Sequence, residues 1–263
     1  MKRTLIGISG KIGSGKDTVG SIIQYLTSEA YTARDRSYDS FLRGHQNPDA
    51  FGHYYHSDWE IKKFAYKLKE AASLLTGIPI SNFEDQDFKK TNLGPEWESV
   101  FIRQTGDGID NTLGPFTSVQ DANHFLEAGI LNHPNISNEL QIHHMTVRDL
   151  LQKLGTDALR NGLHTNVWIN ALFADYTCTH TDQVPNGIDC DKWLITDCRF
   201  PNEALAIKER NGIVIRVTRP GEEVGEHASE TALDNWDFDI VITNDGSIED
   251  LIQKVKTQLA GII

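Results

Sequence analysis

A glycine-rich loop near the start of the chain constrains its fold more than any other feature. The loop spans residues 10–18, follows an apolar segment at residues 4–9, and opens a helical pattern of apolar residues that begins at Val19. Strand, glycine loop and helix in this order form a phosphate-binding loop, because the glycines let successive backbone N–H groups point into one concavity. The helix N-terminus adds partial positive charge, and Lys16 can reach the β- and γ-phosphates of a nucleotide. The sequence therefore predicts a nucleotide site on an α/β sheet.

One position of this loop departs from the usual pattern G-x-x-x-x-G-K-[ST]. Asp17 stands where the pattern has a hydroxyl that binds Mg²⁺, and the hydroxyl comes one place later, at Thr18. A carboxylate at this place can still hold Mg²⁺, directly or through water. We assign both residues to a metal site, and we assign the loop to ATP. The loop residues expected to contact the nucleotide are Gly10, Gly13, Ser14, Gly15, Lys16, Asp17 and Thr18.

Composition and charge exclude several classes of protein. The 263 residues, 39% of them hydrophobic and 24% charged, are typical of a soluble globular chain with one large domain or two small ones. The net charge of −12 argues against a nucleic-acid coat, although a local group of cations can still bind small anions. We find no apolar run of membrane-spanning length and no signal peptide, so we expect a cytoplasmic protein without a membrane or nucleic-acid partner.

The three cysteines form no C-x-x-C pair. They are Cys178, Cys190 and Cys198. An odd number of cysteines without a signal peptide favours free thiols in a reducing compartment.

Apolar patterns along the chain predict a parallel sheet flanked by helices. Strands are expected at residues 4–9, 59–65, 191–197, 213–217 and 239–243. Helices are expected to begin at residues 19 and 147 and to span residues 66–75, 166–179, 202–211 and 247–259. Strands that alternate with helices imply crossover connections and a parallel sheet. Residues 31–58 are polar and predict a surface loop, and residues 81–145 are long enough to hold short helices or an inserted subdomain.

The strand at residues 191–197 ends in a second candidate for the site. Asp197 closes this strand, where phosphate-loop proteins often place an acid that organises Mg²⁺. Arg199 follows at the carboxyl edge of the sheet, where open α/β sheets bind ligands, and its guanidinium can bind phosphate through two hydrogen bonds. The plainer alternative is that Asp197 caps the next helix and Arg199 pairs with Glu203.

Residues 148–160 form a third candidate. On a helix, Arg148, Gln152 and Gly155 lie on one side, and they offer a cation, an amide and a small gap that another molecule can approach. Such groups suit a phosphate and a base edge, but a solvated face with salt bridges is the usual fate of these charges. The same block holds Thr156, Asp157 and Arg160.

Three further segments border the expected ligand edge. Lys67 lies in the first turn after the second strand, whereas the other lysines nearby are expected to be solvated. The turn after the last strand, with Asn244 and Gly246, is expected to line the adenine of ATP. Residues 218–237, which include Arg219, are glycine-rich and polar and form a candidate lid over the phosphates.

Taken together, these motifs resemble the deoxynucleoside monophosphate kinases of tailed bacteriophages, of the T4 type. The resemblance covers the N-terminal loop and most of residues 146–259, and within this family Asp is usual at the place of Asp17. It implies a P-loop kinase fold in one domain, residues 1–263, with a mostly helical region at residues 66–182 that binds the monophosphate. It also implies transfer of the γ-phosphate of ATP to a deoxynucleoside monophosphate with Mg²⁺, in the cytoplasm of an infected bacterium, with a homodimer as a candidate assembly.

The roles that we expect follow from the charge that phosphoryl transfer must neutralise. Lys16, Arg148, Arg160 and Arg199 are the expected catalytic residues. Asp17, Thr18 and Asp197 would position Mg²⁺. The acceptor would contact Lys67, Arg148, Gln152, Thr156, Asp157 and Arg160. Two alternatives remain: a small-metabolite kinase similar to phosphomevalonate kinase or dephospho-coenzyme A kinase, and a non-catalytic nucleotide-binding switch.

Overall fold

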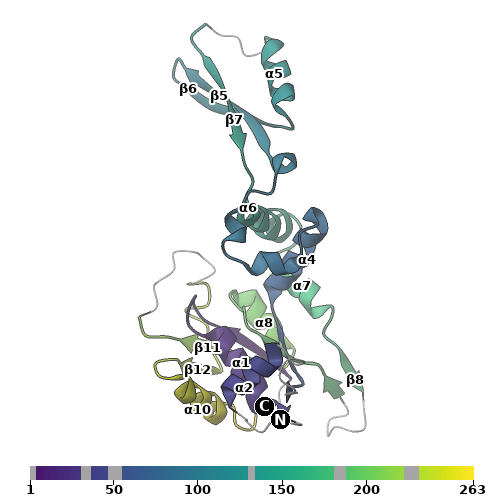
Figure 1. Cartoon of the computed structure of the whole chain (residues 1–263), viewed down its shortest axis with the longest axis vertical. Helices are drawn as coiled ribbons and strands as arrows, with labels where there is room; N and C mark the ends of the chain where they lie inside the picture. Colours follow the sequence, from purple (N-terminus) through teal and green to yellow (C-terminus); the bar gives the residue numbers. More distant parts are fainter. Residues whose placement is uncertain (1–3, 31–36, 47–54, 130–133, 181–187, 222–230) are drawn as a thin grey trace. The chain divides into compact units, whose positions relative to one another are not determined.

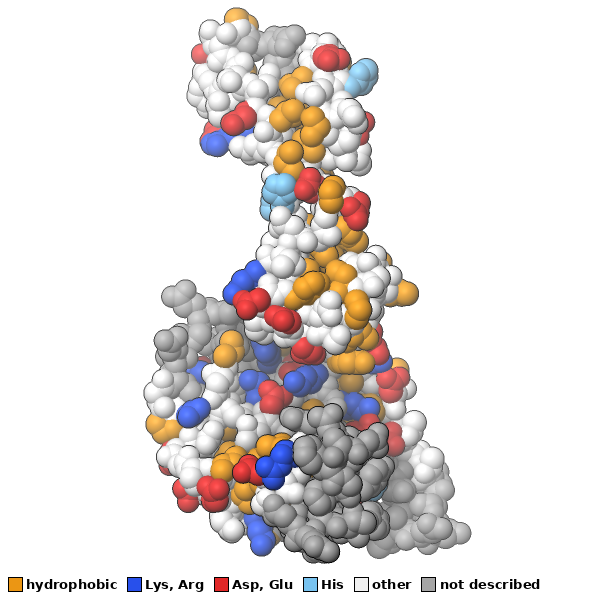
Figure 2. All heavy atoms as spheres, viewed as in Figure 1, with side chains coloured by type: hydrophobic (Ala, Val, Ile, Leu, Met, Phe, Trp, Pro, Cys, Tyr) orange, Lys and Arg blue, Asp and Glu red, His pale blue; other side chains and the backbone are white. Residues whose placement is uncertain are grey.

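The computed structural model describes residues 4–30, 37–46, 55–129, 134–180, 188–221 and 231–263. The chain divides into two compact units (Figure 1). Unit 1 comprises residues 1–67 and 164–263, and unit 2 comprises residues 68–163. Acidic and basic side chains are interspersed on the face that Figure 2 shows. No helix among the described ranges is long and apolar enough to cross a membrane.

Unit 1 is built on a parallel sheet of five strands in the order β12-β11-β1-β10-β4. The strands are β1 (Leu5–Ser9), β4 (Trp59–Lys62), β10 (Lys192–Ile195), β11 (Ile213–Thr218) and β12 (Ile240–Thr243). The earlier strands β4 and β10 lie on one side of β1, and the later strands β11 and β12 lie on the other. The point at which the order reverses is therefore at β1, and open α/β sheets bind ligands at the carboxyl ends of strands at such a point.

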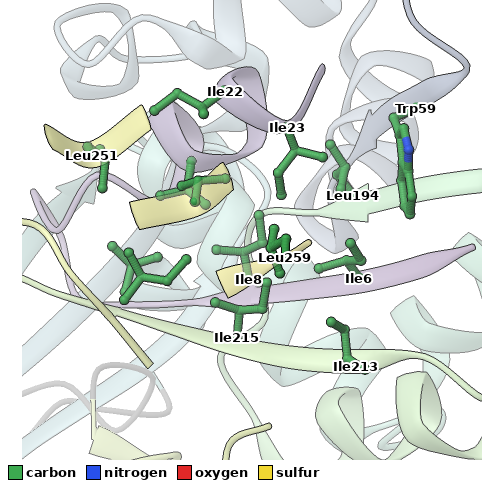
Figure 3. Packing of buried hydrophobic residues seen from close by; sticks show 14 of the residues in the cluster. Ile6, Ile8, Ile22, Ile23, Trp59, Leu194, Ile213, Ile215, Leu251 and Leu259 are labelled. Carbon is green, nitrogen blue, oxygen red and sulfur yellow. The ribbon is translucent and has the colours of Figure 1, made fainter. Parts of the chain in front are cut away.

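Helices cover both faces of this sheet, so its strands are apolar on both sides. On one face, Ile22 and Ile23 of α1 (Lys16–Thr27) pack with Ile6 and Ile8 of β1, together with Leu251 of α10 (Ile248–Gln258) (Figure 3). On the other face, α8 (Pro201–Glu209) lies so close to β1 that a Cβ atom at residue 7, a glycine, would be 2.5 Å from Ile207. Helix α7 (Val167–Phe173) covers β10 on that face, where Phe173 stacks on Trp193. These contacts confirm the predicted sheet flanked by helices.

The expectation of a surface loop at residues 31–58 is wrong for part of that segment. Helix α2 (Tyr38–Gln46) lies within it, and Tyr38 and Phe41 are buried against α1. Tyr38, Phe41 and Leu42 have helical spacing, but polar neighbours hide the pattern. Strand β3 (Tyr55–His56) also lies in this segment and pairs with β2 (Glu29–Ala30). Residues 31–36 and 47–54 are outside the described residues.

The expected helix at residues 166–179 is shorter than predicted, and it is followed by a hairpin. Helix α7 ends at Phe173, and the backbone N–H and hydroxyl of Thr177 both donate to Asp191. Strand β8 (Cys178–His180) then pairs with β9 (Ile188–Cys190). Cys178 and Cys190 lie opposite each other and form a disulfide, so the expectation of free thiols is wrong for this pair. Spacing along the chain could not show a pair that a hairpin brings together; Cys198 is a buried free thiol.

Unit 2 contains a helical part with its own apolar core. Its helices are α4 (Phe64–Thr76), which begins in unit 1, the 3₁₀ turns η1 (Ile80–Glu84), η2 (Phe88–Lys90) and η3 (Pro95–Trp97), α6 (Val147–Gln152) and η4 (Lys153–Asn161). Ala72, Phe83, Val147 and Leu150 form the core. Thr146 and Asp149 cap α6 reciprocally, as their spacing predicts.

Unit 2 also contains an antiparallel sheet that the sequence does not predict. Strands β5 (Ser99–Gly106), β6 (Ile109–Phe116) and β7 (Ser137–His143) form it in the order β6-β5-β7. Helix α5 (Val119–Glu127) covers one face, and the core there includes Ile102 and Ala122 (Figure 1). The expectation of a mostly helical region at residues 66–182 is therefore incomplete. The reason is that only Leu113 and Phe116 of β6 are half-buried and its other residues are exposed, so the strand lacks the regular apolar alternation that predicts one.

The fold predicts a difference between two similar substitutions in unit 1. Ile23 is fully buried, so Ile23→Ala should lower the free energy of unfolding by about 2–5 kcal/mol, through lost burial and a cavity. Leu205 on α8 is 51% exposed, and Leu205→Ala should change it by less than about 1 kcal/mol. Urea denaturation followed by circular dichroism measures both values. Equal losses would mean that α1 does not pack on the sheet as described.

Candidate active site

The glycine-rich loop follows the carboxyl end of β1 and leads directly into α1. Gly13 and Gly15 have φ angles of 80° and 96°, which favour glycine, and α1 begins at Lys16. A Cβ atom at position 13 would meet no atom within 4 Å, so this side of the loop is open. The ammonium of Lys16 folds over the loop and donates to the carbonyl of Lys11 at 3.3 Å. The loop therefore has the backbone conformation and the cation that a phosphate site requires.

Residues from two later strands hold this loop in place. The side-chain amide of Asn244, after β12, donates to the carbonyl of Ser14 at 2.9 Å. The guanidinium of Arg219, after β11, lies 3.5 Å from the carbonyl of Gly13. Gly246 leaves room for Asp250, which caps α10. These three residues follow the carboxyl ends of β11 and β12, and Asn244 and Arg219 contact the loop itself, while their contact with ATP stays a prediction.

Asp17 contacts one residue that follows β10 and one that follows β4. Its Oδ1 atom accepts a hydrogen bond of 2.7 Å from the hydroxyl of Thr196 and lies 3.0 Å from the ammonium of Lys63. Partial burial alone would raise the pKa of Asp17, but these two partners and the charge of Lys16 lower it below its ordinary value. The carboxylate is therefore ionised from neutral pH down to that lowered pKa. Both of these contacts are made by Oδ1.

Asp197 has a structural task at the end of β10. Its two carboxylate oxygens accept hydrogen bonds of 2.9 Å from the backbone N–H groups of Phe64 and Ala65, at the start of α4. Burial raises the pKa of Asp197, and these hydrogen bonds and nearby Arg199 oppose that rise. Asp197 thus caps a helix, as the plainer alternative anticipates, but the helix is α4 and not the one that follows it. Its role at a metal stays a prediction.

Arg199 and Glu203 do interact, although through the backbone. The carboxylate of Glu203 accepts hydrogen bonds from the N–H groups of Arg199 and Phe200, and so caps its own helix α8. Because Glu203 is buried and engaged there, the position of Arg199 after β10 is well fixed. The positive charge of Arg199 also opposes the rise in the pKa of Asp197.

The loop offers few protein ligands to a magnesium ion bound with a nucleotide. Among the described residues no group of three or more His, Cys, Asp and Glu side chains could hold a metal ion alone. Mg²⁺ in nucleotide enzymes usually keeps several waters and is held by one or two carboxylates and the phosphates. Asp17, with Thr18 half-buried beside it in the first turn of α1, supplies that kind of site. The buried hydroxyl of Ser14, which makes no hydrogen bond within the described part of the chain, adds a polar group inside the loop.

Lys63 and Thr196 are site residues that the sequence analysis misses. Lys63 is grouped there with solvated lysines, and Thr196 is not singled out. Thr196 follows the carboxyl end of β10, which pairs with β1, and Lys63 follows the carboxyl end of β4, which pairs with β10. This position is the signal that could have found them. Lys67, by contrast, is assigned to the acceptor from sequence, and the structure shows it paired with Asp175 at 2.7 Å.

In unit 2 the block at residues 148–160 differs from the predicted α-helix. After Gln152 the helix continues as the π-helix η4, whose i→i+5 hydrogen bonds place more residues in each turn. Arg148, Gln152 and Thr156 are exposed, whereas Gly155 is buried. A Cβ atom on Gly155 would lie 2.8 Å from Leu68, so the space that the sequence analysis offers to another molecule is filled by that side chain. Asp157 is exposed and Arg160 is half-buried.

Comparison with known proteins identifies the family of the chain. The model of the deoxynucleotide monophosphate kinase family matches residues 109–255, which is more than half of the chain. The chain therefore belongs to this family. A deoxynucleotide monophosphate kinase of Enterobacteria phage T4 is 36% identical over 115 residues, which are 43% of this chain and 45% of that protein.

Two other phage relatives extend this result. A protein of the same name from Escherichia phage RB69 is 34% identical over 42% of this chain and 43% of its own length. A deoxynucleoside-5′-monophosphate kinase of Escherichia phage T5 is 25% identical over 79% of this chain and 72% of its own length. The alignments thus span less than half of the T4 and RB69 relatives and most of the T5 relative.

The contact between Lys63 and Asp17 predicts a change in a measurable pKa. Lys63→Met should raise the pKa of Asp17, because it removes a hydrogen bond and a positive charge from the ionised form. Lys62→Met is the matched control, since Lys62 pairs with Glu60. A pH titration of the Asp17 carboxyl carbon by NMR gives both values. The described contact is refuted if Lys63→Met and Lys62→Met leave that pKa equally unchanged.

Proposed function

We propose that this protein transfers the γ-phosphate of ATP to a deoxynucleoside 5′-monophosphate and forms a deoxynucleoside diphosphate and ADP. The observation that carries the proposal is the phosphate-binding loop at the switch point of the sheet, in a chain that belongs to the deoxynucleotide monophosphate kinase family. The names of the T4 and T5 relatives supply the acceptor class.

On the donor side, unit 1 would bind the polyphosphate of ATP. The N–H groups of the loop and the ammonium of Lys16 would surround the β- and γ-phosphates, where charge develops during the transfer. Mg²⁺, when bound, would neutralise part of that charge, and Asp17 and Thr18 are the residues that would hold it. Arg199 would stabilise the transferred group. The turn with Asn244 and Gly246 would lie beside the nucleotide.

On the acceptor side, unit 2 would contribute the exposed groups of α6 and η4. Arg148 would bind the phosphate of the monophosphate, and Gln152, Thr156 and Asp157 would contact the nucleoside. No general base is needed, because the attacking phosphate oxygen is already anionic. Cytoplasmic action during phage infection and assembly as a homodimer belong to the same proposal.

One assay separates this proposal from its alternatives. ADP release from ATP is measured in a coupled assay with the four deoxynucleoside monophosphates, the four ribonucleoside monophosphates, phosphomevalonate and dephospho-coenzyme A. The proposal expects turnover with at least one deoxynucleoside monophosphate and none with the last two compounds. Turnover with phosphomevalonate or dephospho-coenzyme A alone would indicate a small-metabolite kinase. ADP release that no acceptor accelerates would indicate a nucleotide-binding switch.

The donor site predicts the effect of one substitution in the loop. Lys16→Ala should reduce kcat by at least about 100-fold, because it removes a charge aimed at the transferred phosphate. The thermal unfolding temperature should stay within about 2 °C, because Lys16 contributes no core contact. Lys256→Ala on the exposed side of α10 is the control and should behave as the wild type. Near wild-type turnover of Lys16→Ala would remove the loop from the catalytic site.

The acceptor side predicts a kinetic signature for Arg148. Arg148→Ala should raise KM for the deoxynucleoside monophosphate and leave KM for ATP unchanged, with a loss of roughly 10- to 150-fold in kcat/KM for a lost charge-assisted contact. Arg148→Lys should recover only part of this, since Lys lacks the planar fork of Arg. Arg160→Ala should lower kcat alone if Arg160 acts only in the transition state. Steady-state kinetics with each substrate varied in turn measures these constants, and a rise in KM for ATP instead would place Arg148 on the donor side.

A further inference from the structure

A group of three cations lies together in the helical part of unit 2. Lys69 comes from α4, Lys89 from η2 and Arg148 from α6. Backbone hydrogen bonds fix the last two elements to each other, since the N–H of Val147 donates to the carbonyl of Thr91 and the N–H of Leu93 donates to the carbonyl of Met145. Lys89 and Arg148 are therefore held near each other by the fold, and do not meet only through flexible side chains.

The surroundings of Lys89 disfavour its positive charge. Burial lowers its pKa most, and repulsion from Lys69 and Arg148 lowers it further, while Glu84 and Asp85 oppose this decrease only in part. Glu84 is already paired with Lys69 at 2.5 Å. A partly desolvated cation between two other cations is costly for a protein unless an anion binds there.

Of the three cations, only Lys69 forms an ion pair within the described part of the chain. The side chain of Lys69 is only 10% exposed and is committed to Glu84. Arg148 is exposed, and its guanidinium lies 3.4 Å from the side-chain carbonyl of Gln86, a neutral partner. Asp85 accepts hydrogen bonds from the N–H groups of Asp87 and Phe88 within its own turn. An incoming anion would thus meet Arg148 and Lys89 with few competing carboxylates.

We infer that Lys89 and Arg148 together form an anion site for the phosphate of the acceptor nucleotide, supported by the ion pair between buried Lys69 and exposed Glu84. The inference rests on the proposed function for the identity of the anion, a nucleoside monophosphate. It assigns to Lys89 a role that the sequence does not suggest, because Lys89 lies in a polar stretch of residues 81–145 beside an equally charged neighbour.

That neighbour provides a matched control. Lys90 follows Lys89 directly, is exposed, and pairs with Asp87 at 2.8 Å. Lys89→Met and Lys90→Met remove the same charge from adjacent positions of one short turn. Lys89→Arg keeps the charge, and it should recover most of the binding that Lys89→Met loses.

The experiment measures binding and turnover with the full chain. Isothermal titration calorimetry gives Kd for the deoxynucleoside monophosphate that the wild type binds most tightly, for the matching deoxynucleoside and for inorganic phosphate. We expect Lys89→Met to raise Kd and KM for the monophosphate by about tenfold or more, the size of a lost charge-assisted contact. Binding of the deoxynucleoside and KM for ATP should not change, and Lys90→Met should match the wild type. Thermal unfolding curves check that each variant is folded.

The outcomes separate this inference from the function on which it rests. If the wild type phosphorylates a deoxynucleoside monophosphate and Lys89→Met binds it as well as Lys90→Met does, the inference is wrong and the proposed function stands. If the wild type phosphorylates none of the four, but binds inorganic phosphate more tightly than Lys89→Met does, the proposed function is wrong and the anion site stands. If Lys89→Met weakens binding of the deoxynucleoside as much as binding of the monophosphate, the inference is also wrong, because the effect of Lys89 would not depend on the phosphate.

Discussion

The parallel pairing of β1 with a strand on each side is the constraint on which the donor site depends. Hydrogen bonds to β10 and β11 fix the axial position of β1 residue by residue, as in the register Gly7 to Ile195 and Gly7 to Val214. Because all three strands run the same way, their carboxyl ends reach one edge together, and the loop leaves β1 there. The helices on both faces exclude water from the strands, so the edge is the place where polar side chains gather.

The carboxyl end of β10 connects that edge to two other elements. Thr196 donates to Asp17 in the loop, and Asp197, the next residue, accepts the first N–H groups of α4. Thr196 and Asp197 form a turn directly after β10, so the end of one strand orients the loop and anchors a helix at the same time. Lys63 completes the arrangement, because it precedes α4 and contacts Asp17. A substitution at any of these residues would therefore change the position or the pKa of the Asp17 carboxylate, which we assign to the metal.

Much of unit 1 can be predicted from the sequence, whereas much of unit 2 cannot. Four strands of the parallel sheet are short apolar runs bounded by glycine, proline or acidic residues, whereas β4 alternates apolar and charged residues. The loop of Gly13 to Lys16 identifies the edge where the site is expected. In unit 2, only Leu113 and Phe116 of β6 are half-buried, so its apolar pattern is weak, and the π-helix changes the side on which Gly155 lies. Lys63 and Lys89 escape prediction for a related reason: the charge of a lysine in a sequence does not tell which groups the fold brings next to it.

The most direct test of the account follows the phosphorus atom itself. ATP labelled at the γ-phosphate with ³²P is incubated with the protein, Mg²⁺ and each deoxynucleoside monophosphate in turn, and the products are separated by chromatography. The account predicts that the label appears in a deoxynucleoside diphosphate in the same molar amount as the ADP formed. Label that appears only as inorganic phosphate, at a rate that no monophosphate changes, would contradict it, because the loop would then support hydrolysis without transfer to an acceptor.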